Sequence, residues 1–168
     1  MFEKNGLNEN VLLKYRQSIT PLGIKMVRTI NVTLEWSLFV RPEDIPMRAG
    51  IYMVIAGRKD ENGSWEPSTY KLLDIGQSGE TGDRLPTHER EPCWKKEKPP
   101  NTDFLYKFAI MPSEKYDEED RRIAECCLRA HTKPPCGSEC NDGYNRKDTV
   151  SITNASKPAP LSEKYSCP

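Results

Sequence analysis

Hydrophobic and polar side chains alternate along residues 29–40, with a polar residue after nearly every apolar one. The apolar side chains fall at every second position: Ile30, Val32, Leu34, Trp36 and Leu38. A period of two is typical of a β-strand that buries one face and exposes the other. The pattern therefore predicts a half-buried strand over this segment.

Two further apolar runs, residues 51–56 and 70–76, flank a turn-rich segment with Asn62-Gly63 at its centre. An Asn-Gly pair between apolar runs favours a hairpin turn, so residues 51–76 are predicted to form an antiparallel β-hairpin with a long tip. Residues 104–111 and 148–154 read as two more strands.

One helix is clearly indicated over residues 113–132. Acidic residues come early in this segment and basic residues come late. Four apolar side chains recur at helical spacing: Ile123, Ala124, Cys127 and Leu128. Charges in this order suit the helix dipole, and Pro134 and Pro135 end the pattern. A second, short helix is predicted to start near Asp83.

These elements predict an α+β fold, with a small mixed or antiparallel β-sheet of three to five strands flanked by helices. Residues 29–153 form the expected domain. Residues 1–28 lack clean periodicity and are interpreted as an N-terminal arm, and residues 154–168 are rich in Ser and Pro and are interpreted as a flexible tail.

Composition narrows the functional classes. The 168 residues carry 25 basic and 25 acidic side chains, so there is no global charge that would attract nucleic acid. A nucleic-acid surface would have to be local, and Arg90, Lys95 and Lys96 are its candidates, although acidic neighbours also allow a solvated mixed-charge face. No apolar run is long enough to cross a bilayer, and the polar N-terminus predicts a cytoplasmic protein.

The chain has six cysteines. In a reducing cytosol they are expected to be thiols or metal ligands rather than disulfides. A structural Zn²⁺ site is a candidate, and its ligands would be Cys127, His131, Cys136 and Cys140. Buried thiols and an exposed loop remain the alternative.

Five polar or glycine-containing elements follow one another along the predicted strands and helices. They are Gly50-Ile51-Tyr52, Asp74-Ile75-Gly76, Arg84 with His88, Glu125, and Asn145. In this order and spacing they resemble the GIY-YIG nuclease family over roughly residues 49–146. The resemblance implies a Mg²⁺- or Mn²⁺-dependent endonuclease whose substrate is DNA.

The chemistry of phosphodiester hydrolysis gives each of these residues a role. Glu125 could hold Mg²⁺, because this hard ion takes oxygen ligands and keeps several waters. Arg84 offers a fork that fits phosphate oxygens, and His88, four residues later on the same predicted helix, could exchange protons. Tyr52 could be the base, provided that positive charge lowers its pKa from its usual value of about 10.

Three features depart from the family pattern. Asp74 stands where the family usually has tyrosine, and it could orient Tyr52 or a water, or help to hold the metal. The turn-rich segment lengthens the distance between the two tripeptides, which need not move the strand ends. Asn145 is the preferred candidate for the family's asparagine, with Asn141 second.

Each candidate also has a structural explanation. Tyr52 could be a packing residue of a strand, Arg84 and His88 an exposed helix face, and Glu125 half of a surface ion pair. The alternative function is therefore a catalytically weakened or inactive module of the same fold that binds nucleic acid or protein, which Asp74 would allow.

Overall fold

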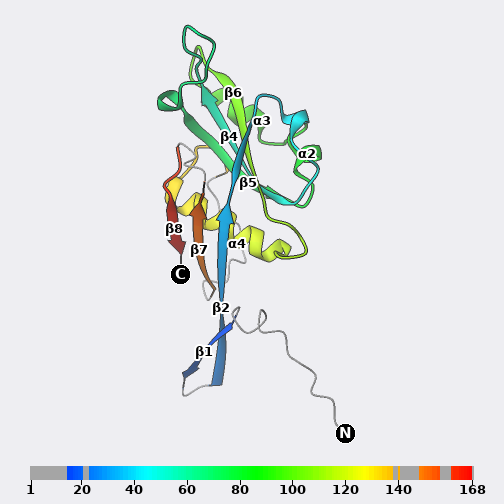
Figure 1. Ribbon diagram of the computed structural model, residues 1–168, viewed down its shortest axis with the longest axis vertical. Coiled ribbons are helices and arrows are strands. Elements are labelled where there is room, and N and C mark those ends of the chain that lie inside the picture. The colour runs from blue at the N-terminus through cyan, green and yellow to red at the C-terminus, as the bar shows by residue number, and fades with distance from the viewer. Residues whose placement is uncertain (1–14, 21–22, 138–139, 141–147, 156–159, 168) are drawn as a thin grey trace.

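A computed structural model of the protein describes residues 15–20, 23–137, 140, 148–155 and 160–167. The fold is α+β, as the sequence predicts. The described strands form two four-stranded sheets rather than one (Figure 1). No helix among the described residues is long and apolar enough to span a membrane.

The first sheet is antiparallel and has the order β3-β6-β4-β5. Its strands are β3 (Trp36–Phe39), β4 (Gly50–Gly57), β5 (Lys71–Ser78) and β6 (Asp103–Ile110). β4 and β5 form the predicted hairpin, and Gly63 takes a positive φ of 81° at its tip. All eight residues of β4 are buried, which fits its position between two neighbours.

The second sheet is mixed, with the order β1-β2-β7-β8 and a parallel β2–β7 pair. Its strands are β1 (Tyr15–Thr20), β2 (Gly23–Leu34), β7 (Thr149–Asn154) and β8 (Lys164–Cys167). β1 and the first half of β2 project away from the rest of the molecule (Figure 1). Part of the predicted N-terminal arm is therefore a β-hairpin that leads into this sheet.

The alternating segment of residues 29–40 is extended, but it is not one strand. It breaks at Glu35, so that Leu34 ends β2 in one sheet and Trp36 begins β3 in the other. The break is held by Asn154, whose side-chain oxygen accepts a hydrogen bond from the Trp36 indole at 3.0 Å. Alternate burial also ends there, because Leu38 is 43% exposed.

The tail prediction is wrong for β8. This strand pairs with β7, and Cys167 near its end is joined by a disulfide to Cys127 on helix α4. The Ser/Pro-rich composition concealed a strand of only four residues.

Helix α4 (Glu118–Thr132) begins five residues later than predicted. Asp117 caps it: its carboxylate accepts the backbone N–H of Asp120, whose side chain in turn accepts the N–H of Asp117. The helix ends at Thr132, and its C-cap residue, Lys133, has a left-handed φ of 48°. Its four predicted apolar positions are all nearly or fully buried.

Two apolar clusters lie on opposite faces of β4. One joins α4 to both sheets and includes Ile51, Met53 and Ile55. The other contains Tyr52, Val54 and Ala56, together with Trp94 of helix α3 (Glu91–Glu97). Because side chains alternate along a strand, Tyr52 faces the α3 side while its neighbours face α4.

Candidate functional site

The two similar tripeptides meet across the β4–β5 hairpin. Tyr52 on β4 lies opposite Gly76 on β5. A Cβ at position 76 would lie 2.7 Å from the Tyr52 ring carbon Cε1 and closer still to Cζ and the hydroxyl oxygen. Glycine is therefore required there, because the phenol ring crosses over the neighbouring strand in the space that a side chain would fill.

The Tyr52 hydroxyl has two polar partners, His88 Nε2 at 2.7 Å and Arg90 Nη2 at 3.3 Å. His88 Nδ1 accepts the backbone N–H of Arg90 at 3.0 Å. A neutral imidazole that accepts at Nδ1 carries its proton on Nε2. The phenol oxygen thus accepts hydrogen bonds from both His88 and Arg90.

The protonation of this pair follows from its burial. Burial, with the nearby Asp74 charge, raises the pKa of Tyr52 to about 12, although Arg90 and Arg84 oppose the rise. Burial, with the same two arginines next in effect, lowers the pKa of His88 to about 4. At neutral pH the site therefore holds a neutral phenol and a neutral imidazole.

Asp74 points into the site and is fully buried. Its Oδ2 accepts hydrogen bonds from Arg90 Nε and from the Trp94 indole, both at 2.8 Å, and its Oδ1 lies 3.7 Å from Arg129 Nη2. Burial raises the pKa of the Asp74 carboxyl, and Arg90 and Trp94 oppose that rise. Asp74 therefore orients Arg90, which in turn contacts the hydroxyl of Tyr52.

Glu125 comes from α4 and reaches the site at the edge strand β5. Arg129 Nη2 contacts Glu125 Oε1 at 2.8 Å, and Arg129 Nε donates to the carbonyl oxygen of Ile75 at 2.8 Å. The side chains of Arg129 and Glu125 are only 7% and 13% exposed, so this is a buried pair rather than a surface one. Burial raises the pKa of Glu125 against the opposing charges of Arg129, Arg90 and Arg84.

The predicted helical spacing of Arg84 and His88 is wrong. Helix α2 (Thr81–Arg84) ends at Arg84, where the chain turns and buries Leu85, and His88 lies in the turn before α3. Both side chains still act on Tyr52, because His88 is hydrogen-bonded to its hydroxyl and the charge of Arg84 opposes the rise in its pKa.

Arg84 is the cation of this group that faces solvent, with its side chain 48% exposed. It lines an open hollow with four other residues that come from the end of β5, the bend after it and α2. They are Ser78, Gly79, Glu80 and Asp83. Its ion pair with Glu89 is long, at 3.8 Å. The guanidinium is therefore available to an incoming anion.

The proposed nucleic-acid residues divide into two kinds. Arg90 is turned inward to Asp74 and Tyr52, with its side chain 24% exposed, so it belongs to the site. Lys95 and Lys96 are exposed on α3, and Lys95 pairs with Glu91 at 2.9 Å. Asn145 and Asn141 lie outside the described residues.

The cysteines are paired, contrary to the expectation of thiols. The three disulfides are Cys93–Cys136, Cys126–Cys140 and Cys127–Cys167. The predicted zinc ligands are thereby divided among three different disulfides, apart from His131. Disulfides are typical of oxidising compartments, which weighs against the expected cytoplasmic location.

Three residues that complete the site were not assigned their roles from the sequence: Arg90, Trp94 and Arg129. A buried carboxylate needs donors, so Asp74 on a buried strand was the signal that basic or indole side chains had to reach it. For Arg129 the signal was its spacing of four from Glu125 on α4. Nothing in the pattern around Trp94 separates a hydrogen-bond donor from an apolar core residue.

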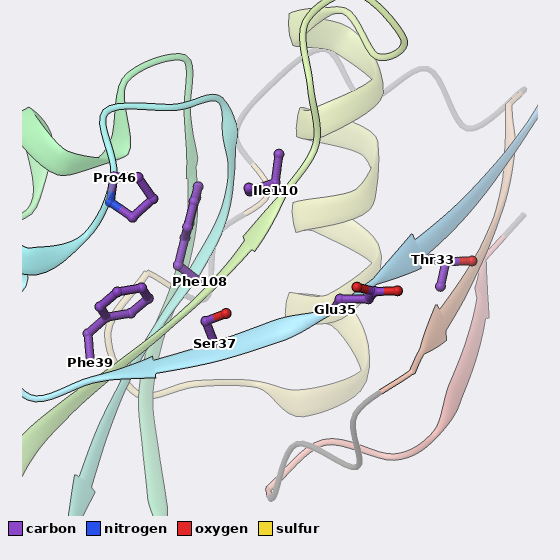
Figure 2. Close-up of a pocket in the computed structure, with 7 residues that line it drawn as sticks. All are labelled: Thr33, Glu35, Ser37, Phe39, Pro46, Phe108 and Ile110. Atoms are coloured by element: carbon purple, nitrogen blue, oxygen red, sulfur yellow. The ribbon is translucent and has the colours of Figure 1, made fainter.

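A second hollow lies over the β3–β6 pair. It is lined by side chains of mixed character, which are Thr33, Glu35, Ser37, Phe39, Pro46, Phe108 and Ile110 (Figure 2). Glu35 is its only ionisable lining residue, and it sits at the end of the hollow nearest β2. This hollow has no group of reactive side chains comparable to that around Tyr52.

Comparisons with protein-family models, with curated proteins and with solved structures find no match to this chain.

Proposed function

We propose that the protein is a Mg²⁺-dependent endonuclease that hydrolyses DNA phosphodiester bonds with a GIY-YIG-type site. The observation that carries the proposal is the cluster around Tyr52. Three side chains form one electrostatically coupled group: Tyr52 from β4, His88 from the turn before α3, and Glu125 from α4. Exposed Arg84 lies at its edge.

Of the two carboxylates in the cluster, one would hold a divalent ion. Oδ2 of Asp74 is taken up by Arg90 and Trp94, whereas Glu125 is held through one oxygen, Oε1, by Arg129. Glu125 is therefore the residue that would hold Mg²⁺ or Mn²⁺. The positive charges of the surrounding arginines would attract the negative charge of a phosphate. When bound, the ion would neutralise charge that develops on the phosphate oxygens.

The chain's own groups supply the remaining chemistry. Arg84 would bind a non-bridging phosphate oxygen from the open hollow. Tyr52 keeps its proton in the free protein, and its phenolate would be stabilised by the two donors on its oxygen, His88 and Arg90. Asp74 and Arg129 position Arg90 and Glu125.

A second function is favoured by a specific observation. Tyr52 and Asp74 are both fully buried, and the pKa of Tyr52 is raised to about 12 by burial and by Asp74, which makes proton removal difficult. The same fold could then bind DNA without cutting it, through Arg84, Lys95 and Lys96.

A plasmid assay with matched variants tests the proposal. Supercoiled plasmid is incubated with Mg²⁺ or Mn²⁺ and the disulfide-bonded protein, beside Tyr52→Phe and Glu125→Ala. We expect cleavage by the parent, its loss in EDTA, and a fall of about 100-fold or more in each variant. Glu118→Ala is the control, because Glu118 lies on the same helix in an exposed pair with Arg122, and it should cut at the parental rate.

Two outcomes would contradict the nuclease proposal. Cleavage that continues at the parental rate in both site variants would show that another site or a contaminant is responsible. An absence of cleavage, combined with DNA binding that EDTA does not affect and that Arg84→Ala weakens, would establish the binding function instead.

A further inference from the structure

A cluster of two cysteines and a histidine lies between α4 and β8. We infer that Cys127, His131 and Cys167 form a zinc site when the Cys127–Cys167 disulfide is reduced. This inference does not rest on the proposed nuclease function.

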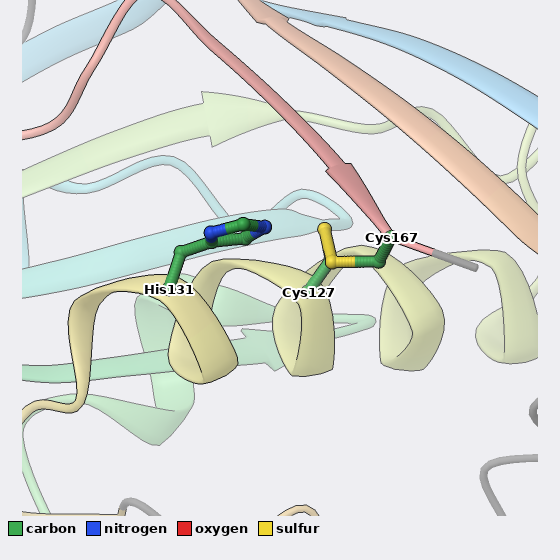
Figure 3. A group of neighbouring side chains, drawn as sticks. All are labelled: Cys127, His131 and Cys167. Carbon is green, nitrogen blue, oxygen red and sulfur yellow. A yellow bond between two sulfur atoms is a disulfide. The ribbon is translucent and has the colours of Figure 1, made fainter.

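Two elements bring the three side chains together. Cys127 and His131 lie one turn apart on α4, and Cys167 reaches them from β8 (Figure 3). Their potential ligand atoms all lie within 4.8 Å of one another. His131 is already held against β8, because its Nε2 is 3.2 Å from the carbonyl oxygen of Ser166 and its ring contacts Tyr165.

The spacing suits a tetrahedral ion. With Zn–S bonds of about 2.3 Å, two ligand atoms of a tetrahedral site lie about 3.8 Å apart. The Cα atoms of Cys127 and Cys167 are 5.7 Å apart, so separating the sulfur atoms to this distance needs side-chain rotation rather than movement of β8. Three protein ligands would leave the fourth position to a water.

The site can form only after a balanced redox step. The disulfide takes two electrons and two protons from a dithiol, which is oxidised to its own disulfide, and Cys127 and Cys167 become thiols. Zn²⁺ then replaces the two thiol protons, because thiolates are the form that binds it. Either the disulfide or the metal would connect β8 to α4, so this attachment would survive a change of redox state.

The four ligands predicted from the sequence included two that the fold places elsewhere. Cys136 is bonded to Cys93 beside α3, and Cys140 is bonded to Cys126. Cys167 takes their place, and it was missed because it lies in the segment that was interpreted as a loose tail.

Metal titration of the full chain tests the inference. The protein is reduced under anaerobic conditions with a phosphine, and Zn²⁺ is titrated against a chromophoric chelator. Near-ultraviolet circular dichroism reports whether the fold is kept. We expect one strongly bound Zn²⁺ in the reduced parent and none in the oxidised parent at this site. Co²⁺ should give sulfur-to-metal charge-transfer absorption with the intensity of two thiolates.

Variants separate this cluster from the other cysteines. Cys167→Ser and His131→Ala should each lower the zinc affinity by about 10-fold or more. His131 is exposed, so its replacement should leave the fold intact. The matched control, Cys93→Ser with Cys136→Ser, removes two thiols of another disulfide and should still bind one ion.

The inference is overturned by either of two results. One is a reduced parent, folded or unfolded, that takes up no Zn²⁺ in competition with the chelator. The other is uptake of one ion that persists unchanged in both Cys167→Ser and His131→Ala.

Discussion

Replacing Gly76 by alanine should disturb the site directly, because the added Cβ would enter the space of the Tyr52 ring. Ordinary contact needs at least 3.4 Å, and Cε1 would lie at 2.7 Å with Cζ and the hydroxyl oxygen closer. The ring must move, although its hydroxyl is held by His88 and Arg90. Overpacking and weakened hydrogen bonds, partly offset by the lower entropy of an unfolded alanine, give a loss of about 2–4 kcal/mol in unfolding free energy.

Urea unfolding of the disulfide-bonded protein measures this loss as a lower midpoint at unchanged slope. Gly79→Ala is the matched control, since its nearest neighbour would be an Arg121 nitrogen at 4.0 Å, and it should change stability by no more than about 0.5 kcal/mol.

A double-mutant cycle then assigns the loss to the ring of Tyr52. Tyr52→Ala alone should cost about 3–5 kcal/mol, and it should cost about 1–3 kcal/mol less in the Gly76→Ala background, where it also removes the overlap. A strictly additive cycle, or a Gly76→Ala protein as stable as Gly79→Ala, would refute the steric argument.

Three further results are expected. Burial depresses the pKa of His88 from 6.5 to about 4, so the unfolding free energy should be at its maximum above pH 6.5 and fall by roughly 3 kcal/mol as the pH drops to 4. His88→Gln should lack this pH-dependent component. An identical pH profile of unfolding free energy in the two proteins would contradict the prediction. Trp94→Phe removes the indole donor to a buried oxygen of Asp74, so it should lower the unfolding free energy by about 1–3 kcal/mol and raise the pKa of Asp74 further. Carboxyl NMR can follow this pKa. An unmoved pKa would exclude the contact between Trp94 and Asp74. Cys93→Ser with Cys136→Ser should lower unfolding free energy by about 2–4 kcal/mol in urea, because the bond closes a separation of 43 residues; an unchanged midpoint would show that the bond does not form.

Most of the secondary structure could be predicted from the sequence, because it depends on local periodicity. The hairpin of residues 51–76 and helix α4 were predicted from alternation, turn residues and apolar spacing, and both are present. The division of residues 29–40 between two sheets was not readable. It depends on Trp36 contacting Asn154, which is 118 residues away in the chain.

The sequence predicted which residues of the Tyr52 cluster lie near one another better than it predicted their contacts. Tyr52, Asp74 and Glu125 do converge, but the sequence placed Arg84 and His88 on one helix that ends after a single turn. Leu85, which follows this turn, is buried, and Pro86 after it has no backbone N–H with which to continue the helix. Disulfide pairing was equally unreadable, because six cysteines allow fifteen connectivities.

The buried charges around β5 give Asp74 a structural role that an uncharged side chain could not fill. Arg90 and Arg129 both enter the interior beside β5, and a guanidinium buried without a counter-charge is costly. Asp74 supplies that charge to Arg90 directly and to Arg129 at longer range, while Glu125 supplies it to Arg129 on the other side. A tyrosine at position 74 would therefore remove the main partner of Arg90 and release the guanidinium that contacts the Tyr52 hydroxyl. An Asp74→Tyr substitution should therefore weaken this site, because the surrounding arginines and Asp74 depend on one another.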